Sequence, residues 1–170
     1  MPLNLKGYSG RILYIDLSSE RTWVKELEEE EVVNFIGGIG LATKIICDEV
    51  DPRVDPFSPE NVLVFMTGPL TGTIVPAANR FVVAAKSPLT LGWGEAHSSG
   101  YWGIELKKAG YDGVVVKGKA KTPVYVYIRD GEVEFRDASK IWGKDTYETE
   151  SLIRSEVGDK EVRVASIGPA

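Results

Sequence analysis

Residues 79–117, NRFVVAAKSPLTLGWGEAHSSGYWGIELKKAGYDGVVVK, contain a strand, a helix and a second strand in succession. The apolar, β-branched run over 81–85 is typical of a buried strand. Residues 101–109 have helical spacing of apolar side chains, with two lysines in the last turn and Gly110 directly after it, which is the pattern of a helix C-terminus. A second apolar strand is predicted over 113–117. This stretch therefore indicates a domain that mixes strands and helices.

The segment before this stretch predicts a hairpin, two helices and a strand. Alternating β-formers separated by a short polar turn indicate the hairpin, and apolar spacing of three and four residues indicates the helices. Acidic residues in a first turn complement the helix dipole, so the first helix is expected to begin in the acidic run. The elements are strands over 11–17 and 22–26, a helix from 28–31 through 35, a helix over 41–50 and a strand over 62–66.

The segment after it adds another hairpin and a helix. Asp130-Gly131 lies between two β-rich runs over 124–129 and 132–136, which is a strong signal for a two-residue hairpin turn. Asp145 with Glu148 can cap a helix that runs to about residue 157. Residues 163–167 have the composition of a buried strand. Because strands come in hairpin pairs with helices interspersed, the sequence predicts an α+β fold rather than a strictly alternating parallel sheet.

The composition is that of a soluble globular protein. Of the 170 residues, 43% are hydrophobic and 26% charged, and the net charge of −5 argues against nucleic acid or an anionic membrane as partner.

The single cysteine, Cys47, excludes an intrachain disulfide and a four-cysteine cluster, and its place beside Ile46 predicts a buried small hydrophobe. With no signal peptide and no apolar run of membrane-spanning length, we expect a cytoplasmic location. The apolar end of the sequence predicts a fragment of a longer polypeptide.

The candidate binding site comprises Arg80 and the run Ala96-His97-Ser98-Ser99-Gly100 before the helix over 101–109. A helix N-terminus leaves backbone N–H groups available to an anion, and an arginine adds a bidentate fork for phosphate oxygens. Gly100 would allow a ligand to approach the backbone closely. These features predict a phosphate-binding cradle.

A purely structural interpretation of the same residues stays open. Ser98 or Ser99 can simply cap the helix, and an arginine at a strand start is usually solvated. His97, the single histidine, has no second metal-ligating side chain at suitable spacing, so only its backbone carbonyl is a candidate ligand for a hard cation.

Two glycine-rich runs are predicted to be tight turns. Gly37-Gly38-Ile39-Gly40 lacks the spacing of the dinucleotide fingerprint, and residues 68–73 lack the lysine of a P-loop. Both are therefore expected where strands and helices meet.

The order of several short motifs along the chain carries more information than any one of them. The motifs are Gly10-Arg11-Ile12-Leu13, Gly37-Gly38-Ile39-Gly40-Leu41-Ala42, Ser58-Pro59-Glu60-Asn61, Gly68-Pro69-Leu70-Thr71-Gly72-Thr73, Lys86-Ser87-Pro88-Leu89-Thr90, Glu105-Leu106-Lys107-Lys108-Ala109-Gly110-Tyr111-Asp112, Gly118-Lys119-Ala120, Asp137-Ala138-Ser139, Ile141-Trp142-Gly143-Lys144 and Ser166-Ile167-Gly168-Pro169-Ala170. In this order they resemble the aldehyde ferredoxin oxidoreductase family over nearly all 170 residues.

This resemblance implies a three-domain cytoplasmic enzyme whose amino-terminal domain is an α+β, sheet-rich saddle under the cofactor. The cofactor would be tungsten, or molybdenum, held by two pyranopterins, with magnesium bridging their phosphates. Aldehydes would be oxidised to carboxylic acids, and electrons would leave through a [4Fe-4S] cluster to ferredoxin. Residues 1–170 would form the tungstopterin-binding domain, truncated at its C-terminal side and without the cluster-binding domains, so that the fragment alone would be inactive.

Carried over by position, the resemblance implies roles for the candidate site. Arg80 matches a phosphate-binding arginine, and His97 falls where an asparagine offers its backbone carbonyl to magnesium. Ser99 replaces a glycine that contacts the pterin, and with Ser98 and Gly100 it completes the expected cofactor-binding set. Ile39 replaces a common arginine. No catalytic residue is expected within this chain.

Other assignments remain open from the sequence. The departures at 39, 97 and 99 also resemble the family branch that includes the tungsten subunit of benzoyl-coenzyme A reductase. A stand-alone α+β binding module with structural glycine turns is a further alternative. Expected partners are ferredoxin, an aldehyde substrate and the remaining domains of the polypeptide, while the sequence does not decide between a monomer and a homo-oligomer.

Overall fold

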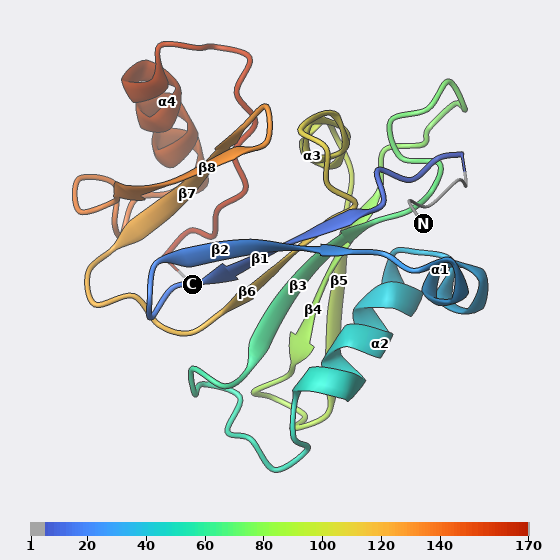
Figure 1. Cartoon of the computed structure of the whole chain (residues 1–170). Coiled ribbons are helices and arrows are strands. Elements are labelled where there is room, and N and C mark those ends of the chain that lie inside the picture. Colours follow the sequence, from blue (N-terminus) through green and yellow to red (C-terminus); the bar gives the residue numbers. More distant parts are fainter. Residues whose placement is uncertain (1–5, 170) are drawn as a thin grey trace. The chain divides into compact units, whose positions relative to one another are not determined.

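The computed structural model describes residues 6–169 and divides the chain into two compact units, Met1–Ala120 and Lys121–Ala170 (Figure 1). A six-stranded sheet in the order β2-β1-β6-β3-β4-β5 forms the first unit. Its strands are β1 (Arg11–Asp16), β2 (Arg21–Glu26), β3 (Val62–Thr67), β4 (Phe81–Lys86), β5 (Trp93–Ser98) and β6 (Gly113–Lys117). Neighbouring strands are antiparallel except for β1 and β6, which are parallel. The α+β prediction is confirmed, whereas hairpin pairing alone did not anticipate this parallel pair.

One face of the sheet is covered by helices α1 (Glu29–Phe35) and α2 (Ile39–Glu49) (Figure 1). Leu41, Ile45 and Ile46 of α2 are buried, as the helical spacing predicted. They belong to one hydrophobic cluster with alternate residues of the central strands, such as Val64 and Val82. Because strand side chains alternate between faces, the other residues of the same strands point to the opposite side.

Helix α3 (Trp102–Lys108) lies on that opposite face. The Trp102 ring lies 4.8 Å from that of Phe81 and 5.3 Å from that of Phe65, centroid to centroid. Gly103 lies against Phe81, where an added Cβ would come within 3.3 Å of the ring. Gly110 follows the helix with φ +94°, in the left-handed region that favours glycine, and so ends the helix as predicted.

A buried carboxylate connects three segments at one edge of this sheet. Asp112 is 1% exposed, and its oxygens accept hydrogen bonds from the backbone N–H groups of Ser9 (3.0 Å) and Gly10 (2.6 Å). The Lys107 ammonium donates to the same carboxylate at 2.6 Å and also to the Gly7 carbonyl. Asp112 therefore fixes the entry into β1, the end of α3 and the start of β6 relative to one another.

The second unit contains the hairpin of β7 (Val124–Arg129) and β8 (Glu132–Asp137), together with α4 (Thr146–Val157). Asp130 and Gly131 at the hairpin turn have φ of 49° and 87°, as a two-residue primed turn requires. The Asp145 carboxylate caps α4 by accepting from the Glu148 backbone N–H at 2.8 Å. Both predictions for this segment are confirmed.

Two local predictions are wrong, and one strand was missed. Residues 163–167 form no strand, and Ile167 is 83% exposed, because no described strand lies alongside to pair with them. Cys47 is exposed, since it lies about 100° round the helix from the buried Ile46. Residues 93–98, for which the sequence predicted no element, form strand β5.

No helix among residues 6–169 is long and apolar enough to cross a membrane.

Replacing Asp112 should destabilise the fold strongly. Asp112→Ala would remove the counter-charge of the buried Lys107 ammonium and leave two backbone donors without their acceptor, and breaking a buried ion pair in this way typically costs about 3–5 kcal/mol. Urea unfolding of the variant should show this as a lower free energy of unfolding.

Asp51→Ala is the matched control, because Asp51 forms an exposed ion pair with Arg53. That substitution should leave the urea midpoint unchanged. Equal midpoints for the Asp112 variant and the native chain would show that the carboxylate does not stabilise the fold.

Candidate functional site

The predicted site residues lie together at one end of the strands of the six-stranded sheet, where β3 and β5 end and β4 begins. In the registers of β3, β4 and β5, Thr67 is opposite Phe81 and Phe81 is opposite Ser98. Arg80 directly precedes β4 and Ser99 directly follows β5, so these two residues are neighbours one step beyond the paired region. The antiparallel β4–β5 hairpin therefore brings Arg80 beside residues 98–100, although Arg80 and Ser98 are 18 positions apart in the sequence.

The Arg80 side chain is available to a ligand. It is exposed, and among residues 6–169 no acidic side chain forms an ion pair with it. The backbone of the same residue is held, because its carbonyl accepts a hydrogen bond from the Thr71 hydroxyl at 2.9 Å. A fixed backbone with an unpaired guanidinium is an arrangement suited to binding an anion.

The backbone of His97 faces away from β4. The Ser87 N–H donates to the Gly92 carbonyl at 2.8 Å, which makes these two residues a hydrogen-bonded pair at the start of the hairpin. Because hydrogen-bonded and non-hydrogen-bonded pairs alternate along an antiparallel ladder, the pair Val82 and His97 is of the second kind. The His97 carbonyl therefore points to the open side of β5, which is an edge strand of the sheet.

The side chains of β5 form a ladder that sequence reasoning missed. The Trp93 indole N–H donates to Glu95 Oε2 at 2.6 Å, and Glu95 Oε1 lies 3.3 Å from His97 Nε2. The hydrogen bond from Trp93, followed by that of His97, holds the pKa of Glu95 below its usual range. The period-two spacing of these three residues was the available signal, and it was obscured by the glycine and alanine between them.

The expected serine cap of α3 is absent. The N-cap residue is Tyr101 rather than Ser98 or Ser99, and no side chain caps the first turn. The register explains this, since Ser98 still belongs to β5. With only seven residues, α3 has a short dipole, so anion binding here depends on Arg80 and local backbone groups.

Gly100 provides open space beside these groups. Its φ is +96°, and a Cβ built on it would meet no atom within 4 Å. A ligand could therefore approach the backbone closely at this position.

Both glycine-rich turns lie at the same sheet edge and have structural contacts. The Gly38 N–H donates to the Thr67 carbonyl at 2.9 Å, and a Cβ on Gly37 would come within 3.1 Å of Pro69. A Cβ on Gly40 would collide with the Phe35 carbonyl oxygen at 2.1 Å. The first run joins helices α1 and α2, and the second lies between strands β3 and β4, so the prediction of turns is confirmed but the expected strand–helix junctions are not.

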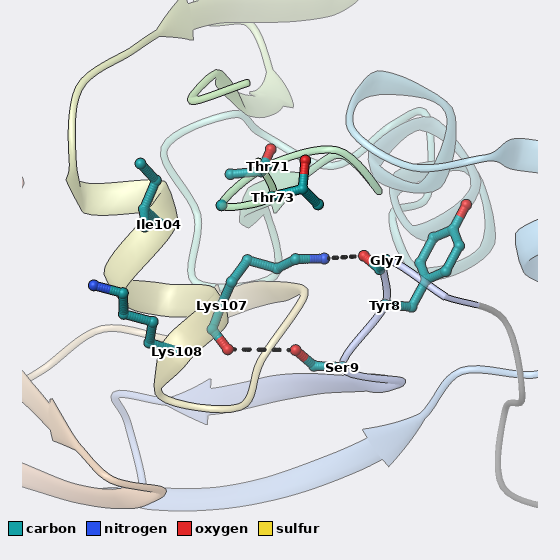
Figure 2. Close-up of a pocket in the computed structure, with 9 residues that line it drawn as sticks. Gly7, Tyr8, Ser9, Thr71, Thr73, Ile104, Lys107 and Lys108 are labelled. Atoms are coloured by element: carbon teal, nitrogen blue, oxygen red, sulfur yellow. Dashed lines mark hydrogen bonds between the residues drawn. The ribbon is translucent and has the colours of Figure 1, made fainter. Parts of the chain in front are cut away.

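A shallow pocket of about 260 Å³ lies beside this edge (Figure 2). Its polar side chains include Thr71, Thr73, Lys107 and Lys108. The Lys107 ammonium is already bound to the Gly7 carbonyl and to Asp112, so it is not free to receive an anion. Neither Arg80 nor any of residues 97–100 lines this pocket, and the strand-edge cradle is therefore a separate feature.

No group of three or more histidine, cysteine, aspartate or glutamate side chains could hold a metal among the described residues. A hard cation at this edge would thus need backbone carbonyls and ligands from outside the described chain.

The pKa of Glu95 provides a test of the β5 ladder. Trp93→Phe removes the indole donor that stabilises the carboxylate, so the pKa of Glu95 should rise toward its ordinary value. Because the folded-state pKa of Glu95 is lowered, its ionised carboxylate stabilises the folded protein at pH values above the ordinary glutamate pKa. This contribution is lost as the pH falls through the folded-state pKa.

NMR titration of the Glu95 carboxyl group in both proteins would measure the shift. Identical Glu95 titration curves would show that Trp93 does not bind the carboxylate in solution.

The sequence of this chain is similar to those of named enzymes over nearly its whole length. A protein from Pyrococcus furiosus named tungsten-containing aldehyde ferredoxin oxidoreductase is 52% identical over 164 residues, and its Pyrococcus horikoshii counterpart is 51% identical. Each alignment covers 96% of this chain but only 27% of the relative. The chain thus spans about a quarter of the length of these relatives.

A solved structure has nearly the same backbone. It is the active-site complex BamBC of benzoyl-coenzyme A reductase with 1,5-dienoyl-CoA, which superimposes with a TM-score of 0.94 at 38% identity. The match covers 96% of this chain and 25% of that one. Residues 12–170 also match the family model described as aldehyde ferredoxin oxidoreductase, N-terminal domain. The chain therefore belongs to the aldehyde ferredoxin oxidoreductase family, in the region of its N-terminal domain.

Proposed function

We propose that this chain is the amino-terminal, cofactor-binding part of a tungsten-containing, or molybdenum-containing, bis-pyranopterin oxidoreductase. The complete enzyme would oxidise aldehydes to carboxylic acids in the cytoplasm and pass electrons to ferredoxin. Family membership and relatives at 51–52% identity that are named for tungsten, aldehyde and ferredoxin support this activity. Because the chain spans 27% of their length, the rest of the catalytic machinery is assigned to the remaining domains.

One observation carries the cofactor assignment: Arg80 is exposed, forms no ion pair with a described residue, and directly precedes Phe81, which lies opposite Ser98 in the β4–β5 register. A phosphate group needs cationic donors and close access to backbone groups. The Arg80 fork supplies the first, and the open space at Gly100 supplies the second. The residues present therefore fit the phosphate end of a pterin cofactor.

The roles of the other site residues follow from where their groups point. The His97 carbonyl, which faces the open side of β5, would offer one ligand to a magnesium ion, while the His97 side chain stays with Glu95. Ser98 and Ser99 add hydroxyl groups beside the phosphate. When bound, the tungsten–pterin group supplies the two-electron chemistry that aldehyde oxidation needs. This chain's residues bind and orient its phosphate end.

The departures from the family pattern fit this assignment. Ser99 is exposed, so its side chain can turn to solvent while its backbone remains accessible. Ile39 is 42% exposed at the α1–α2 turn, where any polar contact of the arginine common in the family is lost.

A benzoyl-coenzyme A reductase-like tungsten subunit is the second candidate. The TM-score of 0.94 to that complex favours it, whereas the higher identity of 51–52% to aldehyde enzymes favours the first. Both candidates use the same cofactor assignment for Arg80 and residues 97–100, so they differ in substrate. Ferredoxin, the remaining domains and a second copy of the chain are the proposed partners.

Arg80→Ala in the full-length protein should weaken cofactor retention. Loss of a charge-assisted hydrogen bond to a phosphate typically costs about 1.5–3 kcal/mol, which corresponds to at least roughly tenfold weaker binding. Metal analysis for tungsten and fluorescence of the oxidised pterin would measure the content of each per polypeptide.

Arg53→Ala is the control, because Arg53 is also exposed but forms an ion pair with Asp51 in the loop after α2. It should retain the wild-type cofactor content. Full tungsten and pterin content in the Arg80 variant would contradict the phosphate role.

The 170-residue chain by itself should not oxidise aldehydes. It holds one cysteine and therefore cannot bind a four-cysteine iron–sulfur cluster. Assays of the purified chain with aldehyde and an artificial electron acceptor should give no rate above the buffer blank, and a reproducible turnover would refute the assignment of catalysis to other domains.

A further inference from the structure

We infer that Thr71 is a positioning residue for Arg80: its buried hydroxyl holds the Arg80 backbone so that the guanidinium is presented at the sheet edge. This inference rests on the proposed function of Arg80 as a phosphate ligand. Thr71 itself touches no proposed ligand, and it acts through the residue to which it is bonded.

The Thr71 hydroxyl joins the two ends of the connection between β3 and β4. It donates to the Arg80 carbonyl at 2.9 Å and accepts from the Gly68 N–H at 3.2 Å. Gly68 directly follows β3, and Arg80 directly precedes β4. A single side chain therefore closes a loop of thirteen residues, from 68 to 80, at its base.

The remainder of this loop cannot hold Arg80 in the same way. The Gly72 N–H donates to the Ala78 carbonyl at 2.9 Å, which closes the outer part of the loop. The residues at its tip are strongly exposed, and the Ile74 side chain has no burial at all. Within the part of the chain described here, the Thr71 hydroxyl is the one side-chain group that forms a hydrogen bond with Arg80.

Burial makes this hydroxyl effective. Thr71 is 5% exposed, so water competes little for its hydrogen bonds. Thr73 on the same loop provides the contrast (Figure 2), because it is exposed and, among residues 6–169, its hydroxyl forms hydrogen bonds to the backbone of Leu70 and Val75 alone. The two threonines thus have similar chemistry, but only one is connected to Arg80.

The test compares variants of the full-length, cofactor-loaded protein. Thr71→Val keeps the shape of the side chain and removes the hydroxyl, whereas Thr71→Ser keeps the hydroxyl. The readout is the rate at which tungsten and pterin are lost from the protein in a buffer containing inorganic phosphate as competitor. Thermal unfolding of each variant reports whether the fold is retained.

We expect Thr71→Val to lose cofactor about five- to tenfold faster than wild type, in line with the loss of one buried hydrogen bond. Thr71→Ser and Thr73→Val should lose it at close to the wild-type rate. If Thr71→Val gives too little folded protein, Thr71→Cys replaces it, because a thiol is a weaker donor of similar size, and an intermediate rate is expected.

The double variant Thr71→Val with Arg80→Ala distinguishes positioning from a general effect on the fold. If Thr71 acts through Arg80, the valine substitution should change the rate less than twofold once Arg80 is alanine. An equal acceleration in both backgrounds would overturn the inference while leaving the phosphate role of Arg80 intact.

The remaining outcomes are also decisive. Wild-type retention by Thr71→Val, with rapid loss by Arg80→Ala, would overturn the role of Thr71 alone. Wild-type retention by Arg80→Ala would refute the proposed function of the site, and the positioning role would fall with it.

Discussion

The buried carboxylate of Asp112 is the constraint on which the first unit depends. A carboxylate that is 1% exposed is tolerated only when its oxygens are paired, and here the partners come from the segment before β1 and from the last turn of α3. The parallel pairing of β1 with β6 follows from this meeting, because both strands start beside Asp112. Since β6 also pairs with β3, the same constraint places the rest of the sheet.

The candidate site depends on this arrangement through the strand registers. The end of β3, the start of β4 and the end of β5 lie at the same edge as Asp112, whose carbonyl accepts from the Thr67 N–H at 2.9 Å. Loops at this edge carry the exposed groups, while the strands behind them are buried. This is how a rigid sheet can hold Arg80 and the backbone of residues 97–100 close to each other.

Much of the fold could be predicted from the sequence, because local signals decide it. Hairpin turns such as Asp130-Gly131, the Asp145 cap and the buried stripe of α2 depend on neighbouring residues, and all are confirmed. The parallel β1–β6 pair depends on contacts between distant segments, which no local pattern encodes, whereas the period-two signal of β5 was obscured by its glycine and alanine. The same limit applied to the site, since the sequence suggested Arg80 and residues 97–100, but the role of Thr71 and the ladder at Glu95 required the register.

The open edge of β5 has a consequence for how the protein behaves in solution. Exposed edge strands are templates for pairing with another chain, and natural proteins usually protect them with lysine, proline or a bulge. Strand β5 contains none of these, and glycine and alanine occupy two of its six positions. Its own protection consists of its short length and the charge of Glu95. A ligand held at residues 97–100 would cover the last part of this open side, where the His97 carbonyl faces outward.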